Sequence, residues 1–207
     1  MGKWVCYNVE KGGVRCMICY LLRHGKDDDT VRGGWSQSPL SAEGKAQAVE
    51  LAGFIQSRSL DIRHIYSSDL PRAMETAQPV AEKLRLPVLP KPEFRETNNG
   101  ELAGMKNEVA SARYPGLYWN TLQWEQQYPG GESPREFYER ICRAWADFQR
   151  EILERNENVL LVTHGGVIQV VLSIVNGEAY SNKTSRRNIR NGELITLEYQ
   201  NGAWREI

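Results

Sequence analysis

The sequence predicts a three-layer α/β/α fold, in which helices cover both faces of a mainly parallel central sheet. Short apolar runs alternate with longer segments whose apolar residues recur at helical spacing. Two of these runs, 18–22 and 159–162, are followed after one intervening residue by a histidine and a glycine. Because ligands bind beyond the carboxyl ends of the strands in such folds, the same pattern predicts a site at one sheet edge.

The first half of the chain contains three predicted strands and two predicted helices. The strands are Ile18–Leu22, Ile62–Tyr66 and the short edge strand Pro87–Pro90. Ser41 is a good N-cap for the first helix. The second helix begins at Pro71 with candidate N-caps at 67–69, and it runs toward Leu84. Pro79 lies inside this helix, so a kink or a break is expected there.

The second half begins with an irregular segment, 91–131, which we interpret as a lid or insertion because it is rich in glycine, asparagine and aromatic residues. The elements predicted after it are a helix capped by Ser133 that runs to about Glu154, a strand at Asn158–Val162, a helix from Gly165 to near Gly177, and strands at Glu193–Tyr199 and Ala203–Ile207. Asn201-Gly202 predicts a hairpin turn between the last two strands.

Length and composition indicate a single soluble domain, 1–207, in which 1–16 is a possible N-terminal extension. Lysine plus arginine equals aspartate plus glutamate, at 26 each, so we expect no broad surface for nucleic acid or for anionic membranes. No apolar stretch approaches the roughly 20 residues that span a bilayer, and 1–16 lacks the pattern of a secretory signal. A cytoplasmic location is therefore expected.

The chain has 4 cysteines, and the spacing Cys16-x-x-Cys19 invites a metal or redox interpretation. A tetrahedral zinc site needs two further ligands, and neither a second such pair nor a histidine pair supplies them. Cys19 also lies inside the first predicted strand. A structural, reduced role is favoured, and we expect no metal here.

Basic residues stand at three predicted strand-to-helix turns: Arg23 and His24, then Arg72, then His164. If the strands are parallel neighbours, these side chains meet at one edge, where helix N-termini also offer amide donors to an anion. Each residue has a structural interpretation as well, because a lone histidine at a strand end is usually structural. The third histidine, His64, fits that interpretation, since neither glycine nor arginine adjoins it. The shared setting of the other two predicts a phosphoryl pocket that contains a nucleophile.

Five short segments then follow one another in a specific order. They are Arg23-His24-Gly25, the stretch 65–73 with Thr76-Ala77, Phe94-Arg95-Glu96 with 100–105, Pro129-Gly130-Gly131-Glu132-Ser133, and Val162-Thr163-His164-Gly165-Gly166. In this order they resemble the histidine phosphatase superfamily, the phosphoglycerate mutase-like family, over about residues 17–199. The resemblance implies that fold and points to the phosphatase branch.

The resemblance implies a phosphatase that hydrolyses phosphate monoesters of a small metabolite without a metal or a cofactor. His24 would be the nucleophile that forms a phosphohistidine. Arg23, Arg72 and His164 would bind the phosphoryl oxygens, and Glu96 would protonate the leaving oxygen and then activate water. A nearby carboxylate, that of Glu101, is disfavoured because Glu96 aligns with the family's position.

The loop after the first histidine, 26–35, departs from the family pattern. Many members have Trp-Asn there, with the asparagine facing the phosphate, and this loop is shorter. Arg32 or Gln37 could replace that contact, and they join Gly25 and Gly165 in the expected substrate-binding set. The aspartates at 27–29 are expected to face solvent or to select a substrate with a positive group.

Asn98 and Asn99 stand where members often carry apolar residues, which predicts an unusually polar pocket. Two other functions remain open. One is mutase-type phosphoryl transfer, which is disfavoured because the chain lacks the extra length of the family's mutases. The other is a non-catalytic module that binds a phosphorylated ligand, although such a protein would usually have lost His24, Glu96 or an arginine. A phosphatase acting on phosphohistidine or phosphotyrosine in proteins is a variant of the favoured function.

Overall fold

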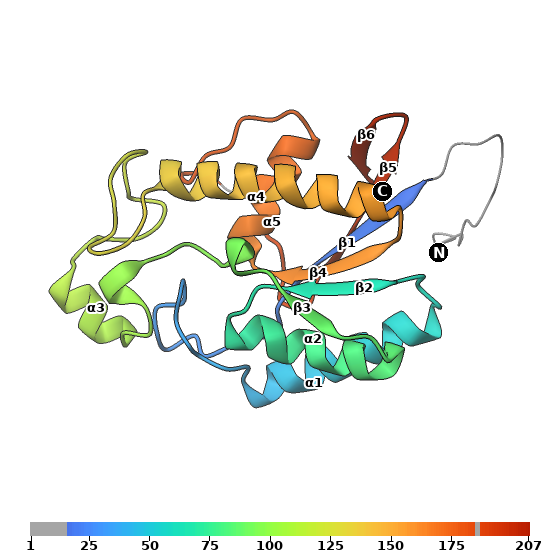
Figure 1. Ribbon diagram of the computed structural model, residues 1–207. Coiled ribbons are helices and arrows are strands. Elements are labelled where there is room, and N and C mark those ends of the chain that lie inside the picture. The colour runs from blue at the N-terminus through green and yellow to red at the C-terminus, as the bar shows by residue number, and fades with distance from the viewer. Residues whose placement is uncertain (1–15, 185–186) are drawn as a thin grey trace.

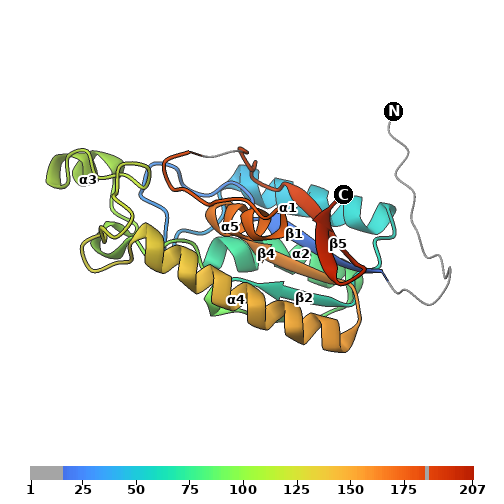
Figure 2. The same cartoon turned by 90° about the horizontal axis from the view of Figure 1, so that it is seen from above.

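Helices cover both faces of a central sheet in the computed structural model, which describes residues 16–184 and 187–207 (Figures 1 and 2). On one face lie α1 (Ala42–Ser57) and α2 (Pro71–Leu84), and on the other lie α4 (Pro134–Arg155) and α5 (Gly165–Val175). This confirms the predicted three layers. The possible extension at 1–16 lies, except for its last residue, outside the described residues.

Within the described ranges the sheet has six strands in the order β3-β2-β4-β1-β5-β6. The strands are β1 (Met17–Arg23), β2 (His64–Ser67), β3 (Val88–Pro90), β4 (Val159–Thr163), β5 (Leu194–Gln200) and β6 (Ala203–Glu206). The strands β3, β2, β4 and β1 are parallel, whereas β5 and β6 form the predicted antiparallel hairpin. The prediction of a mainly parallel sheet is therefore confirmed.

The strand register brings the ends of three strands together. In β1 and β4, Arg23 lies opposite Thr163, and in β2 and β4, Ser67 lies opposite Val162. All residues of the central strand β4 are buried. The residues that follow the ends of these strands therefore lie close together. Two of them are His24 and His164.

Each face of the sheet has its own apolar core. Helix α4 packs on one face through Phe137, Ile141, Trp145, Phe148 and Ile152. Ala73, Ala77 and Val80 of α2 pack on the other face with Ala52 and Ile55 of α1. Ser133 begins α4 with a capping box, in which its side chain accepts from Glu136 N and its own N–H donates to the Glu136 carboxylate. These helices hold the sheet edge that carries the site.

Helix α2 differs from the prediction at two points. It continues through Pro79 to its end, so the expected break is absent, because Ala77 and Val80 on either side are buried in the core. Its N-cap is Leu70, without a capping side-chain hydrogen bond. The predicted caps at 67–69 were wrong, since the Ser68 hydroxyl and the Asp69 carboxylate have partners elsewhere in the fold.

The irregular segment 91–131 contains the short 3₁₀ turns η1 (Pro92–Phe94) and η2 (Gly100–Leu102) and helix α3 (Asn107–Arg113). In Figure 1, α3 lies away from the sheet, beyond the N-terminal end of α4. A small separate core of Leu102, Leu122 and Tyr128 holds this segment together. Among the described helices, none is long and apolar enough to cross a membrane. Cys16 is exposed and Cys19 is buried in β1.

Candidate active site

Two histidine rings lie side by side beyond the ends of β1 and β4. The ring centroids of His24 and His164 are 5.1 Å apart, and the ring planes are tilted by 60°. The register explains this contact, because each histidine directly follows one member of the Arg23–Thr163 pair. Both side chains are buried. The sequence prediction that these strand ends converge is therefore confirmed.

The hydrogen bonds of His24 fix its tautomer. Its Nδ1 lies 2.7 Å from the carbonyl oxygen of Gly25, and a carbonyl can only accept, so Nδ1 carries the proton. The other ring nitrogen, Nε2, keeps its lone pair and accepts from Arg72 Nε at 3.3 Å. Burial, followed by the charge of Arg72, lowers the pKa of His24 to about 3. His24 is thus a neutral imidazole with a basic nitrogen in the site.

Arg72 lies in the first turn of α2 and is 1% exposed. Its Nη2 donates to the carbonyl of Gly34 at 2.6 Å, and its Nη1 donates to the carbonyl of Ser36 at 3.2 Å. The loop after His24 therefore wraps around this guanidinium and fixes its orientation. A buried, oriented positive charge beside the unprotonated His24 Nε2 is suited to stabilising a phosphoryl group.

Two buried nitrogen atoms at this edge, Arg23 Nε and His164 Nδ1, have no hydrogen-bond partner among the described residues. His164 Nε2 lies 2.8 Å from Ser68 Oγ, which accepts from Leu70 N at 3.4 Å. In the tautomer in which the Ser68 hydroxyl donates to Nε2, the His164 proton lies on Nδ1. Burial, then Arg72, lowers the pKa of His164 well below its usual value. In that tautomer both unpartnered atoms are N–H donors, which suits an anion.

Glu96 is docked on the first turn of α5, which begins directly after His164. One carboxylate oxygen accepts from Gly166 N at 3.0 Å, and the other accepts from Thr97 N at 3.1 Å. A β-carbon at Gly166 would lie 2.4 Å from Glu96 Oε1, so the carboxylate keeps this place only because residue 166 is glycine. By contrast, Glu101 is exposed and bonds Tyr114 at 2.5 Å. Of Glu96 and Glu101, Glu96 is the carboxylate that lies beside the basic cluster.

Arg140, in α4, holds the segment that carries Glu96. Its guanidinium donates to the main-chain carbonyls of Glu93, Arg95 and Glu96 at 2.9, 3.1 and 3.0 Å. It also forms a two-pronged ion pair with Glu132 at 2.7 and 3.1 Å. Sequence reasoning missed this residue. A basic residue three positions after buried Phe137, on the apolar face of the helix, was the available signal.

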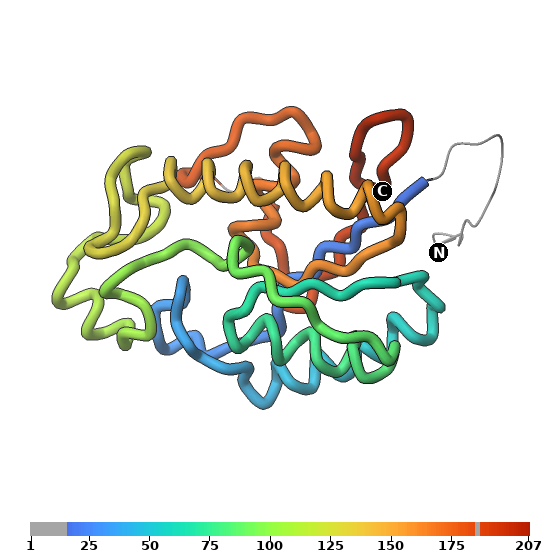
Figure 3. Tube along the Cα trace, in the orientation of Figure 1, coloured from blue at the N-terminus to red at the C-terminus, as the bar shows by residue number. Residues whose placement is uncertain are grey.

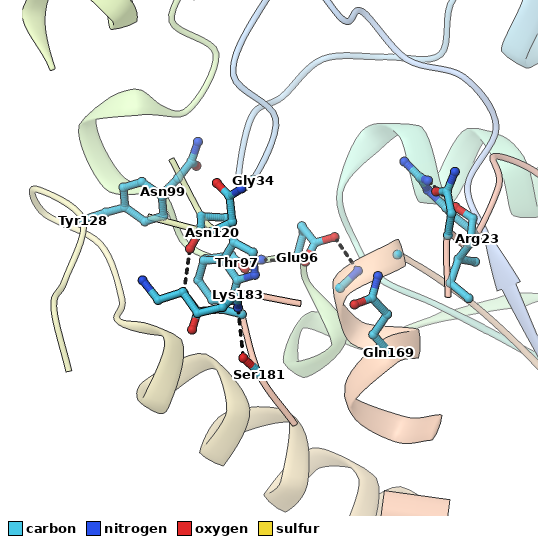
Figure 4. Close-up of a pocket in the computed structure, with 16 residues that line it drawn as sticks. Arg23, Gly34, Glu96, Thr97, Asn99, Asn120, Tyr128, Gln169, Ser181 and Lys183 are labelled. Carbon is cyan, nitrogen blue, oxygen red and sulfur yellow. Dashed lines mark hydrogen bonds between the residues drawn. The ribbon is translucent and has the colours of Figure 1, made fainter. Parts of the chain in front are cut away.

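A pocket of about 480 Å³ opens beside these residues. In Figure 4, Arg23 and Gln169 lie on one side of Glu96, and Asn99 and Tyr128 lie on the other. The remaining lining residues are Gly34, Thr97, Trp119, Asn120, Gly165, Gly166, Ser181, Asn182, Lys183, Asn188 and Ile189. Side-chain amides are frequent in this lining. Asn99 lines the polar pocket that the sequence predicted, whereas Asn98 bonds Gly100 N instead.

Two segments that are far apart in the sequence, 119–122 and 182–183, form the outer wall of the pocket. They lie side by side in Figure 3. The Asn182 amide donates to the carbonyls of Trp119 and Leu122 at 2.7 and 3.0 Å. Lys183 Nζ donates to the carbonyl of Thr121 at 2.9 Å. The sequence carries no signal for this wall, because both segments are loops without periodicity.

Arg32 and Gln37 do not line the pocket. The Arg32 guanidinium stacks over the Tyr118 ring at 4.4 Å and donates to Ser111 Oγ at 3.3 Å. The Gln37 amide donates to the carbonyl of its neighbour Trp35 at 3.4 Å. Both side chains have local partners, but Arg32 Nε is a further buried nitrogen without a hydrogen-bond partner among the described residues. Their contact with a phosphoryl group stays a prediction.

Three further predictions concern Gly25, the aspartates at 27–29 and His64. Gly25 supplies the carbonyl that binds His24 and packs so tightly on α1 that a β-carbon would lie 2.7 Å from Gly44 O. Asp28 is exposed, as expected, but Asp27 turns inward to Arg72. His64 forms an ion pair with Glu157 at 2.6 Å, in keeping with its structural interpretation.

The fold and these contacts define a class: an α/β protein in which two buried histidines, two arginines and a docked carboxylate lie together at one sheet edge. The family model described as "Histidine phosphatase superfamily (branch 1)" matches residues 19–206, and the chain belongs to this family. The resemblance drawn from the five sequence segments is thereby confirmed.

Similar proteins include phosphatases and mutases. The chain is 30% identical over 191 residues to "Uncharacterized phosphatase PhoE" of Bacillus subtilis (strain 168), covering 91% of each chain. It is 33% identical over 193 residues to "Probable phosphoglycerate mutase GpmB" of Enterobacter sp. (strain 638), covering 89% of this chain and 86% of that protein. The mycobacterial glucosyl-3-phosphoglycerate phosphatase structure matches with a TM-score of 0.75 at 27% identity, covering 93% and 97%.

Proposed function

We propose that this protein is a metal-independent phosphatase that hydrolyses phosphate monoesters of a small metabolite through a phosphohistidine intermediate. The geometry of His24 carries the proposal: Nδ1 is held by the Gly25 carbonyl, and Nε2 presents a lone pair beside Arg72. A nucleophile needs that combination of a neutral ring and a fixed orientation.

In the first step, His24 Nε2 attacks phosphorus and the bond from phosphorus to the ester oxygen breaks. Arg23 Nε, Arg72 and His164 Nδ1 hold the phosphoryl oxygens through N–H donors. Glu96, in its protonated form, gives its proton to the departing oxygen, which leaves as an alcohol. The arginine charges stabilise the negative charge in the transition state, so the chemistry proposed here requires no metal.

In the second step, a water molecule attacks the phosphorus of the phosphohistidine. The Glu96 carboxylate takes a proton from this water, and the phosphorus–nitrogen bond breaks. Its electron pair returns to His24 Nε2, and inorganic phosphate leaves. Each group ends in its starting state, with Glu96 protonated and His24 neutral.

The pocket supports a small polar leaving group. Amides and hydroxyls provide most of its polar lining, and Lys183 adds a positive charge at the outer wall. Such groups bind hydroxyl-rich molecules. The mycobacterial glucosyl-3-phosphoglycerate phosphatase is similar to 93% of this chain, which supports a substrate of this size.

Phosphate release from p-nitrophenyl phosphate, measured with an excess of EDTA, tests the proposal. We expect turnover in EDTA and a loss of at least about a thousandfold in His24→Ala, since covalent catalysis is then abolished. His64→Ala is the matched control, because His64 is bound to Glu157 at the surface, and it should keep full activity. Strict metal dependence, or equal activity of both variants, would refute the mechanism.

Mutase-type transfer is the second candidate, because relatives such as the Enterobacter protein carry that name. The two functions differ in the fate of the phosphoryl group. A mutase interconverts 3- and 2-phosphoglycerate without releasing phosphate, whereas the proposed phosphatase releases one phosphate for each ester consumed. Product analysis with 3-phosphoglycerate therefore separates them.

A further inference from the structure

The loop after His24 contains three consecutive aspartates, and the proposed reaction uses none of them. Asp28 and Asp29 are exposed, and the Asp28 carboxylate accepts from Thr30 N at 2.9 Å. Asp27 is different, because its Oδ2 lies 3.4 Å from Arg72 Nε. The same Nε donates to the nucleophilic nitrogen of His24 at 3.3 Å. A carboxylate therefore contacts the guanidinium that we assign to the phosphoryl oxygens.

We propose that Asp27 is a resident counter-ion of Arg72 that competes with the phosphoryl group for this guanidinium and thereby weakens the binding of phosphate. The inference rests on the proposed function, since it assumes that Arg72 binds phosphoryl oxygens. It assigns Asp27 a role in product release, because a site that binds inorganic phosphate less tightly releases it sooner.

The backbone around Asp27 is held in place by the start of α1. The carbonyl of Lys26 accepts from Ser41 N at 2.9 Å and from Ser41 Oγ at 3.0 Å. Lys26 N donates to the Gln47 side chain at 2.9 Å, and Asp27 itself forms a β-bridge with Leu40. The start of α1 thus holds the loop over Arg72.

The charges around Asp27 do not cancel its competition with an anion. Arg72 of α2 and Arg23 of β1 attract its carboxylate, and Asp28 repels it. Lys26 pairs with Glu43 of α1 at 2.8 Å instead. A phosphate dianion that approaches Arg72 meets the negative charge of Asp27, and like charges in a partly buried site repel strongly.

This competition depends on pH. Burial raises the pKa of Asp27 above its ordinary value, although Arg72 opposes the shift. Below that pKa the carboxyl is neutral, so it no longer repels an anion and can donate a hydrogen bond to it. The penalty that Asp27 imposes on phosphate is therefore largest at neutral pH and disappears as the pH falls through the pKa of Asp27.

Calorimetric titration with inorganic phosphate tests the inference without requiring turnover. At pH 7, Asp27→Asn should bind phosphate about tenfold more tightly than the natural chain, because one repelling charge is removed. The ratio of the two dissociation constants should approach one as the pH is lowered. Asp29→Asn is the matched control, because it removes the same charge from an exposed position, and its affinity should change less than about twofold.

Asp27→Glu keeps the negative charge and should keep the weak affinity for phosphate. Thermal melting of each variant checks that it is folded. Unchanged or weaker binding in folded Asp27→Asn would overturn the inference, because a residue that only positions Arg72 loses affinity when it is altered. If neither the natural chain nor Asp27→Asn binds phosphate, the proposed phosphoryl site itself is wrong. Binding by both with equal affinity refutes the role of Asp27 alone.

Discussion

Arg140 Nη2 donates to the main-chain carbonyl of Glu96 at 3.0 Å, and the same nitrogen binds Glu132 at 2.7 Å. One guanidinium therefore connects α4, the loop before it and the segment that carries the proposed acid. Trp35 Nε1 donates to the same Glu96 carbonyl at 2.7 Å. The Glu96 side chain is positioned through its backbone as well as through its own contacts.

Arg140→Lys should lower kcat/KM most for substrates with poor leaving groups. Lysine cannot reproduce the forked hydrogen bonds of the guanidinium, so Glu96 shifts away from the departing oxygen. We expect a loss of about tenfold with p-nitrophenyl phosphate and about a hundredfold with an alkyl phosphate, because only the second needs full protonation. Arg143→Lys, at an exposed position of the same helix, is the control, and equal losses on both substrates would contradict the positioning role.

Gly166→Ala should impair the same proton transfer by a different route. The added β-carbon would lie 2.4 Å from Glu96 Oε1, so the carboxylate must leave its place on α5. Activity toward an alkyl phosphate should fall at least about a hundredfold. Gly53→Ala in α1 meets no atom within 4 Å, and it should keep full activity and raise the free energy of unfolding by about 0.5–1 kcal/mol. Full activity of Gly166→Ala would show that the Glu96 contact is dispensable.

Ser68→Ala should weaken phosphate binding by about tenfold, because the Ser68 hydroxyl orients the His164 ring through a 2.8 Å hydrogen bond. Without it, the proton of His164 is no longer fixed on Nδ1. The dissociation constant for inorganic phosphate, measured by calorimetry, checks this expectation. Ser173→Ala is a suitable control, since that buried hydroxyl bonds Val170 O within α5. Similar affinity of the two variants for phosphate would show that Ser68 does not support phosphate binding.

The stability of the protein should fall as the pH drops below neutrality. Unfolded His24 titrates near 6.5, whereas burial and Arg72 lower the pKa of folded His24 to about 3. Between these values the unfolded chain binds a proton that the folded chain does not, so acid favours unfolding. From pH 6.5 to pH 5, His24 alone should cost about 2 kcal/mol. Urea unfolding of His24→Asn should show a correspondingly smaller loss, and an identical pH slope would contradict the shift.

The sequence predicted the parts of the site that follow strands. An apolar run that ends in a polar residue indicates both a strand and its carboxyl edge, so the pattern alone places Arg23, His24 and His164 together. The same pattern predicted Arg72 at a third strand-to-helix turn, and the family resemblance added Glu96. The α/β layers, the hairpin turn and the cap at Ser133 could be predicted for the same reason, because local sequence patterns indicate each of them.

The parts that sequence could not predict depend on contacts between distant segments. Arg140 reaches back to Glu96, and Asn182 bonds the loop at 119–122. The contacts of Arg32 with the Tyr118 ring and of Gln37 with the Trp35 carbonyl also join segments whose proximity the sequence does not record. Pro79 does not break α2, because burial on both sides outweighs one lost hydrogen bond. In each case tertiary packing decides the outcome, and a one-dimensional pattern does not record it.

The central claim is that His24 Nε2 carries the phosphoryl group between substrate and water. Rapid quenching at alkaline pH during turnover of p-nitrophenyl phosphate, followed by peptide mass spectrometry, tests it most directly. We predict a peptide containing His24 that is heavier by one phosphoryl group, labile to acid and absent in His24→Ala. A phosphoryl group on another residue, or rapid turnover by His24→Ala, would contradict the account.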